Sequence, residues 1–390
     1  MKILMVAPQP FFEPRGTPFS VLGRLKALSK LGHEVDLVTY HIGEDVVIPD
    51  VVIRRIPDIP FIRKISIGPS AKKLFLDMFL LVKTMSLLMR RRYDLLHSHE
   101  EASFFCVFFA KVFRVPHLYD MHSSLPQQLG NFQYSKFSPL IWLFTFLEKI
   151  TINSSQAVIT ICPALEEQVK DVCPHAPHLM IENMTIERSP DSVPDEDVQQ
   201  FKATYQLEGR RIVLYTGTFE TYQGIPLLIQ SAKAVVEKIP NVVFVLMGGT
   251  PQQVDDVRSQ IKEEGLLSSF CLTGSRPSTE IPCAIRAADI LVSPRIKGTN
   301  TPLKIYAYLQ SGKPIVATNL STHTQVLNEH VAFLTDTNET AFANGILDSL
   351  MHEEDATARG HRARELFETQ FSYDIYLEKT AKILDLALKT

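Results

Sequence analysis

The chain has 390 residues, of which 45% are hydrophobic and 21% are charged. This length predicts about two domains, and the composition is ordinary for a globular protein. The net charge of −3 argues against a nucleic-acid-binding protein, because such proteins usually carry a strong basic excess. The opening run MKILMVAPQP is short and breaks at Pro8, so we interpret it as a first strand and not as a signal peptide.

The first half of the chain alternates short apolar runs with amphipathic stretches. Strands are predicted at residues 2–7, 35–39, 51–56, 94–97, 117–119 and 157–161. A helix is predicted over residues 18–31, with Thr17 as its N-terminal cap and Gly32 as its stop. A long helix precedes the strand at residue 94, and another helix begins near Ala164. This alternation is typical of a doubly wound α/β domain with a parallel sheet.

Residues 186–199 are rich in Pro, Asp and Ser, and we expect them to form a linker. The second half then repeats the rhythm, with strands predicted at 212–216, 242–247, 270–273, 290–292 and 314–317 and a helix over 227–236. The predicted fold is therefore two Rossmann-like domains facing each other across a cleft. They cover residues 1–185 and 200–371, with a helix over 372–390 returning to the first domain.

The segment from Ser293 to Asn319 predicts a strand end, a polar loop, a helix, a glycine stop and a further strand. Thr301 is expected to cap the helix and Pro302 to fit its first turn. Gly312 stands where a left-handed C-terminal cap belongs. The helix start would then present free backbone N–H groups to the loop.

Three basic residues, Arg295, Lys297 and Lys304, surround this helix start. A helix N-terminus with cations beside it favours anions, and a diphosphate is the natural guest. An ordinary capped helix with solvated cations is the alternative interpretation of the same segment.

Two stretches, residues 74–89 and 137–152, are apolar enough to lie on a membrane surface, although neither offers the ~20 uninterrupted apolar residues of a membrane span. Burial within the domain is the interpretation we favour for both. A peripheral contact with the inner face of a membrane stays open. The five cysteines are odd in number and show no metal-like spacing, so we expect reduced thiols in a cytoplasmic protein.

Five segments in order resemble the retaining glycosyltransferases of family 4, which have the GT-B fold. They are RLKALSKLGHEVDLVTY, DLLHSHE, YTGTFETYQGIPLLIQSA, LQSGKPIVATN and ARELFETQFSYDIYLEKTAKIL. The resemblance implies transfer of a sugar from a nucleotide-sugar donor to a hydroxyl acceptor, with retention at the anomeric carbon. It also implies no metal and no cofactor beyond the donor, which is a co-substrate. We expect a glycan or lipid-linked acceptor, and a small-molecule acceptor fits the sequence as well.

The chain departs from the family pattern at the polar contacts to the donor. The family's Arg and Lys that reach the diphosphate match Thr218 and Gln223 here, and its pair of Glu residues matches Thr299 and Ala307. We expect the cations to have moved to the polar loop and helix described above. A divergent transferase is the interpretation we favour, and a catalytically silent subunit and a nucleotide-sugar epimerase remain alternatives.

The predicted site residues fall into three groups. His122 follows a predicted strand, where the resemblance implies a His near the donor sugar, and we assign it a catalytic role with Arg295 and Lys304. Donor contacts are expected from Gly217, Thr218, Gln223, Gly249, Ser275, Arg276, Lys297, Thr299, Asn300 and Thr301. The acceptor side is expected to include Gly16, Thr17, His99 and Glu100. The spacing of His97 and His99 mimics a metal site, but no further ligand is evident and we expect no metal.

Overall fold

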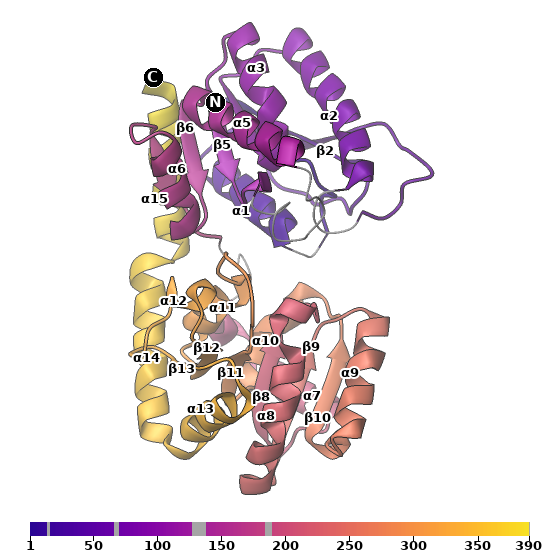
Figure 1. Cartoon of the computed structure of the whole chain (residues 1–390), viewed down its shortest axis with the longest axis vertical. Coiled ribbons are helices and arrows are strands. Elements are labelled where there is room, and N and C mark those ends of the chain that lie inside the picture. The colour runs from indigo at the N-terminus through magenta and orange to yellow at the C-terminus, as the bar shows by residue number, and fades with distance from the viewer. Residues whose placement is uncertain (14–15, 66–69, 127–137, 184–188, 390) are drawn as a thin grey trace. The chain divides into compact units, whose positions relative to one another are not determined.

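The computed structural model describes residues 1–13, 16–65, 70–126, 138–183 and 189–389. The chain divides into two compact units, shown in Figure 1. The first comprises Met1–Met184 together with Tyr373–Thr390, and the second comprises Thr185–Ser372.

The first unit contains a parallel sheet with the strand order β3-β2-β1-β4-β5-β6-β7. Its strands are β1 (Lys2–Val6), β2 (Glu34–Thr39), β3 (Val51–Arg55), β4 (Leu95–His99), β5 (His117–Met121), β6 (Ala157–Thr160) and β7 (His178–Met180). The central strands β1, β4 and β5 are almost completely buried, as expected of a parallel sheet covered on both faces.

Helices cover the two faces of this sheet. They are α1 (Gly16–Lys30), α2 (Ala71–Arg90), α3 (Ser103–Phe113), α5 (Ser138–Ser154), α6 (Pro163–Val172) and α15 (Tyr373–Lys389), with the short η1 (Glu100–Ala102). Helices α2, α3, α5 and α6 pack one beside the next, whereas α1 packs against α15. The buried residues of α2 recur every fourth position, at Leu76, Leu80, Thr84 and Leu88, and Ser70 caps its start.

The second unit contains a parallel sheet with the order β10-β9-β8-β11-β12-β13. Its strands are β8 (Arg211–Thr216), β9 (Val242–Met247), β10 (Phe270–Gly274), β11 (Ile290–Ser293), β12 (Ile315–Thr318) and β13 (Phe333–Thr335). Its longer helices are α7 (Asp195–Thr204), α8 (Ile225–Lys238), α9 (Pro251–Glu263), α10 (Ile281–Ala287), α11 (Leu303–Ser311), α13 (Glu339–Met351) and α14 (Glu353–Gln370). Single turns occur at η2 (Pro190–Ser192), η3 (Thr221–Gln223), η4 (Leu267–Ser269), η5 (Ser278–Glu280) and α12 (Ser321–Thr324).

The predicted fold class is confirmed, and the differences lie at segment ends. Helix α1 begins at Gly16, so Thr17 lies inside the helix and is not its cap. Helix α11 begins after Pro302, which is itself the N-cap, and no side chain makes a capping hydrogen bond there. Thr301 therefore does not cap α11 as we expected, whereas Gly312 does adopt the left-handed conformation, with φ of 66°.

Most of the segment expected to be a linker is part of the second unit. Residues 190–192 form η2, and α7 starts at Asp195. Val198 and Phe201 on α7 are buried in the core of the second unit, so the polar composition of this segment belongs to an amphipathic helix.

The apolar stretches of α2 and α5 are not fully buried, which corrects the expectation that we favoured. Leu74 and Met78 on α2 are 67% and 64% exposed, and Trp142 on α5 is 67% exposed. Residue 137, where the second stretch was expected to start, lies outside the described residues. None of the helices in the described part of the chain combines the length and apolar character needed to cross a bilayer.

Each sheet reverses its strand order once, between β1 and β4 in the first unit and between β8 and β11 in the second. In open parallel sheets, ligands bind beyond the carboxyl ends of the strands at this reversal. The loops after β4, β8 and β11 are therefore the places where the fold positions a site.

Candidate active site

In the second unit, the loops after β8 and β11 are held together by close backbone contact. The backbone N–H of Ile296 donates to the carbonyl of Tyr222 at 3.0 Å. Gly224, with φ of 75°, lies so near Pro294 that a Cβ would stand 1.9 Å from the carbonyl oxygen of Pro294. Only glycine fits this position, and the glycine thereby fixes how η3 and the β11 loop meet.

Lys304, in the first turn of α11, reaches into the loop after β8. Its Nζ lies 3.4 Å from Oε1 of Gln223 and 3.7 Å from the centre of the Tyr215 ring. A Cβ on Gly217 would lie 3.1 Å from the same Nζ. Among the described residues, no carboxylate forms an ion pair with Lys304. Burial, and next the charge of Arg295, hold the pKa of the ammonium well below its usual value.

Arg295 organises the loop after β11 through its guanidinium group. Its Nε donates to the carbonyl of Lys297 at 2.7 Å and its Nη1 donates to the carbonyl of Asn300 at 3.0 Å. The guanidinium carbon lies 5.1 Å from the centre of the Tyr222 ring. Burial lowers the pKa of Arg295, and no acidic side chain pairs with it in the described part of the chain. Two cations that no described carboxylate neutralises thus lie at the strand reversal of the second sheet.

His323, which the sequence analysis missed, holds the ends of β11 and β12 together beneath the loop after β11. Its Nε2 is 2.9 Å from the hydroxyl of Ser293, and its Nδ1 is 2.8 Å from the carbonyl oxygen of Thr318. Burial lowers the pKa of this histidine to about 4, so the ring is neutral near pH 7. The Thr318 hydroxyl in turn donates to the carbonyl of Arg295 at 2.5 Å. A lone His after a strand gives no sequence signal that separates this supporting role from a surface position.

The other predicted donor contacts are spread over several loops. Gln223 is buried in η3, and the carbonyl of Thr218 accepts a hydrogen bond from Tyr215 at 2.7 Å. Gly249 lies against the Phe219 ring, which leaves no room for a Cβ. Thr301 is buried before α11.

The polar loop of the second unit is only partly tied down. Lys297 and Thr299 are exposed, and the Thr299 carbonyl accepts from Gln325 at 2.6 Å. The Thr299 hydroxyl lies 3.3 Å from the side-chain oxygen of Asn300. The exposed side chains of this loop are thus available to a ligand.

Arg276 and Ser275 follow β10, two strands away from the reversal. The Arg276 guanidinium makes two hydrogen bonds to Glu280, at 2.9 and 3.1 Å. The structure therefore does not bring Arg276 to Lys304 and Arg295, and it supplies this cation with an acidic partner.

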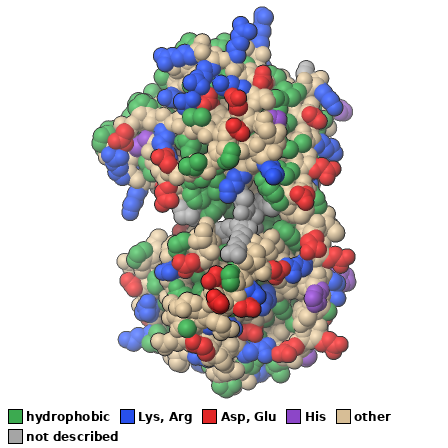
Figure 2. Space-filling view, turned by 180° about the vertical axis from the view of Figure 1, so that it is seen from behind, with side chains coloured by type: hydrophobic (Ala, Val, Ile, Leu, Met, Phe, Trp, Pro, Cys, Tyr) green, Lys and Arg blue, Asp and Glu red, His purple; other side chains and the backbone are tan. Residues whose placement is uncertain are grey.

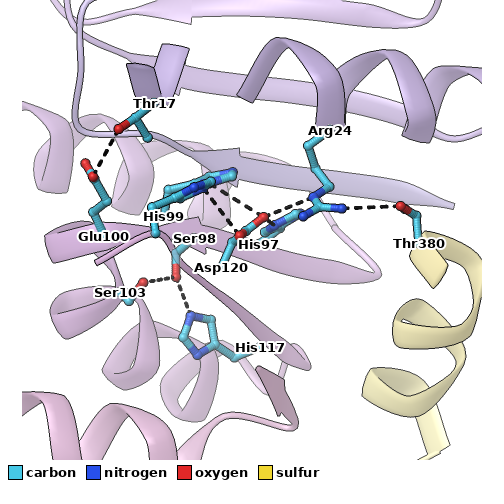
Figure 3. Close-up of polar contacts among 11 residues, drawn as sticks. Thr17, Arg24, His97, Ser98, His99, Glu100, Ser103, His117, Asp120 and Thr380 are labelled. Atoms are coloured by element: carbon cyan, nitrogen blue, oxygen red, sulfur yellow. Dashed lines mark hydrogen bonds and ion pairs between the residues drawn. The ribbon is translucent and has the colours of Figure 1, made fainter. Parts of the chain in front are cut away.

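In the first unit, Asp120 at the end of β5 is the centre of a buried polar cluster, shown in Figure 3. Its Oδ2 accepts from Nε of Arg24 at 3.0 Å and lies 3.3 Å from Nε2 of His97. Arg24 also donates to the hydroxyl of Thr380 on α15 at 3.3 Å. Burial alone would raise the pKa of the Asp120 carboxyl, but Arg24 holds it well below its usual value.

His99 and His122 contact each other beside this cluster. The sequence predicted both as site residues but did not predict this contact. Nδ1 of His99 lies 2.9 Å from Nε2 of His122, and the rings stack with centroids 5.2 Å apart. Nε2 of His122 is 3.3 Å from Oδ1 of Asp120. Burial lowers the pKa of both histidines, so both rings are neutral at pH 7. Each can then accept one hydrogen bond and donate another.

The acceptor-side residues are partly brought together. The Thr17 hydroxyl donates to Oε1 of Glu100 at 3.3 Å, and Gly16 starts the same helix as Thr17. Glu100 itself has φ of 48°, an uncommon conformation for a residue other than glycine. Burial and the neighbouring charge of Glu101 raise the pKa of Glu100 to about 7.

His97, His99 and Asp120 could together hold a metal ion, because their ligand atoms lie within 4.8 Å of one another. Arg24, however, already bonds the same carboxylate oxygen and supplies a positive charge there. This arrangement favours an internal ion pair at Asp120. The expectation that no metal is needed stays a prediction.

Comparison with known families decides the class of the chain. The family described as Glycosyl transferases group 1 matches residues 197–366, and the family described as Glycosyltransferase Family 4 matches residues 15–182. The chain belongs to the glycosyltransferases. The two matches cover most of both units, and the resemblance noted in the sequence is confirmed.

Curated relatives of this chain are about a quarter identical to it over the residues that align. The 2-deoxystreptamine glucosyltransferase of Streptomyces kanamyceticus is 26% identical over 45% of this chain and 46% of its own length. The phosphatidyl-myo-inositol mannosyltransferase of Mycolicibacterium smegmatis is 23% identical over 84% of this chain and 78% of its own. The glycosyltransferase thus aligns with about half the length of the first relative and with most of the second.

Solved structures share the fold of this glycosyltransferase over nearly its whole length. Anabaena HepE in complex with UDP has a TM-score of 0.75 at 17% identity, covering 99% of this chain and all of HepE. Sucrose-phosphate synthase from Thermosynechococcus elongatus also has a TM-score of 0.75, at 19% identity and with 98% of each chain covered. The GT-B fold class, with two Rossmann-like sheets, is therefore confirmed.

Proposed function

We propose that this chain transfers a sugar from a nucleotide-sugar donor to a hydroxyl group of an acceptor. The observation that carries the proposal is a pair of cations, Lys304 and Arg295, at the strand reversal of the second sheet, for which the described residues provide no acidic partner. Cations that lack a counter-charge at such a position suit a diphosphate, which brings the missing negative charge. The family matches and the names of the relatives support the same activity.

The chemistry follows from where charge develops. The bond between the anomeric carbon and the diphosphate oxygen breaks, and Lys304, Arg295 and the N-terminus of α11 stabilise the departing negative charge. The acceptor oxygen forms the new bond to the anomeric carbon, and its proton passes to an oxygen of the departing phosphate. Attack from the face that the diphosphate leaves gives retention, as the family 4 resemblance implies.

In the first unit, we assign His122 to contact with a substrate hydroxyl. His99 supports its ring at 2.9 Å and Asp120 lies 3.3 Å from its Nε2. A neutral His122 donates or accepts without adding charge to the reacting sugar. Thr17 and Glu100, which contact each other at 3.3 Å, are assigned to the acceptor.

A donor screen followed by turnover tests this function. Melting temperatures measured with UDP-, GDP-, ADP- and TDP-sugars should rise with one class of donor, because a ligand that binds the folded state stabilises it. The selected donor is then incubated alone and with candidate glycan or lipid-linked acceptors, with and without EDTA. A new glycoside formed equally well in EDTA supports the proposal.

Other outcomes of these incubations contradict it. Isomerisation of the donor without any acceptor would indicate an epimerase. Failure of every donor to bind, or binding without turnover under all conditions, would indicate a silent subunit. An inverted anomeric configuration in the product, measured by the coupling constant of the anomeric proton, would contradict retention but not the sugar transfer itself.

The exposed apolar side chains of the first unit support a peripheral membrane contact. On α5, Trp142 stacks on Phe146 at 5.7 Å, and both are exposed. Arg90, Arg91 and Arg92 are exposed at the end of α2, and Figure 2 shows Lys and Arg side chains gathered at the top of the first unit. Exposed apolar rings and exposed basic side chains on one unit suit a membrane with anionic lipids.

Trp142 is the single tryptophan of the chain and therefore reports on this contact directly. Its fluorescence should shift to shorter wavelength with vesicles containing anionic phospholipid, and less so in Phe146→Ser or at high salt. An emission spectrum that anionic and neutral vesicles both leave unchanged would contradict a membrane contact at α5.

A further inference from the structure

We propose that a pocket in the first unit, between Glu100 and Glu148, binds a positively charged amino group of the acceptor. The inference rests on the proposed sugar transfer and names the chemical class of its acceptor. The pocket is lined by both carboxylates together with Glu101, Phe104 and Tyr119.

Glu148, on α5, has a carboxylate oxygen that lacks a partner. Its Oε1 accepts from the hydroxyl of Ser124 at 3.2 Å and from the amide of Gln168. The backbone N–H of Leu125 also favours the ionised form of Glu148. Oε2 is nevertheless buried without a hydrogen-bond partner among the described residues, and the whole residue is 3% exposed. A buried carboxylate oxygen without a donor is costly, so it suits a ligand that brings one.

Glu100 forms no ion pair of its own within the described part of the chain, although the charge of Lys73 lies close enough to favour its ionised form. Glu100 accepts a hydrogen bond from the neutral hydroxyl of Thr17, whereas the neighbouring Glu101 forms an ion pair with Lys73 at 2.6 Å. The pocket therefore holds more carboxylates than cations. Burial raises the pKa of both Glu100 and Glu148 to about 7, which shows that the ionised forms are poorly compensated in the free protein.

The shape and walls of the pocket suit an ammonium group. The free space is about the size of one water molecule, which is also about the size of an ammonium head. Phe104 and Tyr119 line the pocket as well, and aromatic rings attract cations. A neutral hydroxyl could donate to Oε2 of Glu148 but would leave the excess negative charge in place.

The pocket adjoins the histidines assigned to substrate contact. Glu100 directly follows His99, and Ser123, which also lines the pocket, directly follows His122. An acceptor anchored by an amino group between Glu100 and Glu148 would thus lie near these histidines. This places the amine-binding pocket on the acceptor side predicted from sequence.

Three matched sugars test the proposal in the full chain: glucosamine, N-acetylglucosamine and glucose. Ligand-observed NMR at pH 7.5 measures their affinities for the unmodified protein, Glu148→Gln, Glu100→Gln and Glu167→Gln. Glu167 is exposed on α6 and controls for the loss of one negative charge from the same unit. Glucosamine should bind about tenfold more tightly than the two neutral sugars, and each pocket variant should remove that preference. The Glu167→Gln variant should keep it.

Equal affinity for the three sugars, or an unchanged glucosamine preference in both pocket variants, would overturn the proposal and leave the pocket as a water site. The thermal melting of each variant verifies that it is folded. Nucleoside diphosphate binding by the unmodified protein is measured in parallel. Selective glucosamine binding without diphosphate binding would contradict the transferase proposal and leave the amine-binding pocket. Diphosphate binding without selective glucosamine binding would contradict the pocket alone.

Discussion

The Nζ atom of Lys304 lies 3.4 Å from the side-chain oxygen of Gln223, although the two residues are 81 positions apart in the chain. Gln223 is the residue that matches the family's diphosphate-binding Lys. We propose that Lys304, from α11, supplies in space the positive charge that is missing from the loop after β8. This contact supports a site in which the cation comes from a different sequence position than in the family but lies at the same place in the fold.

Nucleoside diphosphate binding should depend on the charge of Lys304. Because burial lowers the pKa of this ammonium in the free protein, the group loses its proton at a lower pH than an ordinary lysine. A bound diphosphate favours the protonated form, so affinity should fall about tenfold per pH unit above the free-protein pKa. Calorimetric titrations between pH 7.5 and 10 measure this fall.

Lys304→Gln provides the comparison for that titration. It should bind more weakly at pH 7.5 and show a nearly flat profile over the same range. An identical decline in the variant would assign the pH dependence to another group.

The strands of the second unit could be predicted from the sequence, because each is a short apolar run that ends at glycine or polar residues. Strand β9 was predicted with its observed bounds, Val242–Met247. The polar loop before α11 and its cations followed from the same pattern, whereas the order of the strands in the sheet came only from the structure. The contact between Lys304 and Gln223 could not be predicted, because it depends on where a long side chain from one loop ends against another.

The buried ion pair between Asp120 and Arg24 should be essential for stability. In Asp120→Asn the guanidinium of Arg24, which is 2% exposed, would lose its only acidic partner among the described residues. Removing one member of a buried pair costs about 3–5 kcal/mol. Urea unfolding of the variant measures the change in the free energy of unfolding.

The exposed pair Arg63–Asp58 offers a matched control, with both side chains more than half exposed. Asp58→Asn should change the free energy of unfolding by less than about 1 kcal/mol. Equal effects of the two substitutions would contradict the importance of the buried cluster.

Arg24 shows what sequence reasoning overlooked in the first unit. It lies on the apolar face of α1, three residues after Val21 and four before Leu28, both of which are buried. A charged residue on such a face needs a buried partner. That signal was present, but its partners, Asp120 and Thr380, are 96 and 356 residues away and become evident only in the fold.

Glu148 should make stability depend on pH in a defined direction. Its pKa is raised from 4.5 to about 7 in the folded protein, so the folded state binds more protons than the unfolded state between these values. The stabilisation of the folded state by Glu148 is therefore fully present below about pH 4.5, and it is lost as the pH rises through about 7. In Glu148→Gln this contribution is absent.

The difference in the free energy of unfolding between Glu148→Gln and the unmodified protein should shift in favour of the variant by about 1–3 kcal/mol from pH 5 to pH 8. Chemical denaturation at the two pH values measures it, with Glu167→Gln as the control that should show no such gain. A difference that is constant with pH would mean that the Glu148 carboxyl has an ordinary pKa.

Gly224 should be irreplaceable for the contact between the loops after β8 and β11. A Cβ there would stand 1.9 Å from the carbonyl oxygen of Pro294, and φ is 75°. Gly224→Ala should therefore displace the β11 loop, lower stability by about 1–3 kcal/mol and weaken diphosphate binding.

Gly209→Ala separates the effect of the backbone angle from that of the contact. Gly209 has a similar φ of 70°, and its Cβ would meet nothing within 4 Å. The Gly209 variant should lose some stability but keep its affinity for diphosphate. Loss of binding in both variants would indicate a general effect of unfolding.

The central claim is that Lys304 replaces a cation missing at position 223, and moving the charge back tests it most directly. Calorimetry with the nucleoside diphosphate selected by the donor screen compares the unmodified protein, Lys304→Gln, and Lys304→Gln combined with Gln223→Lys. We predict that Lys304→Gln weakens binding about 10- to 100-fold, because a charge-assisted hydrogen bond contributes about 1.5–3 kcal/mol. The second substitution should restore most of that affinity. Unchanged affinity in Lys304→Gln, or a double variant that binds no better than Lys304→Gln, would contradict the claim.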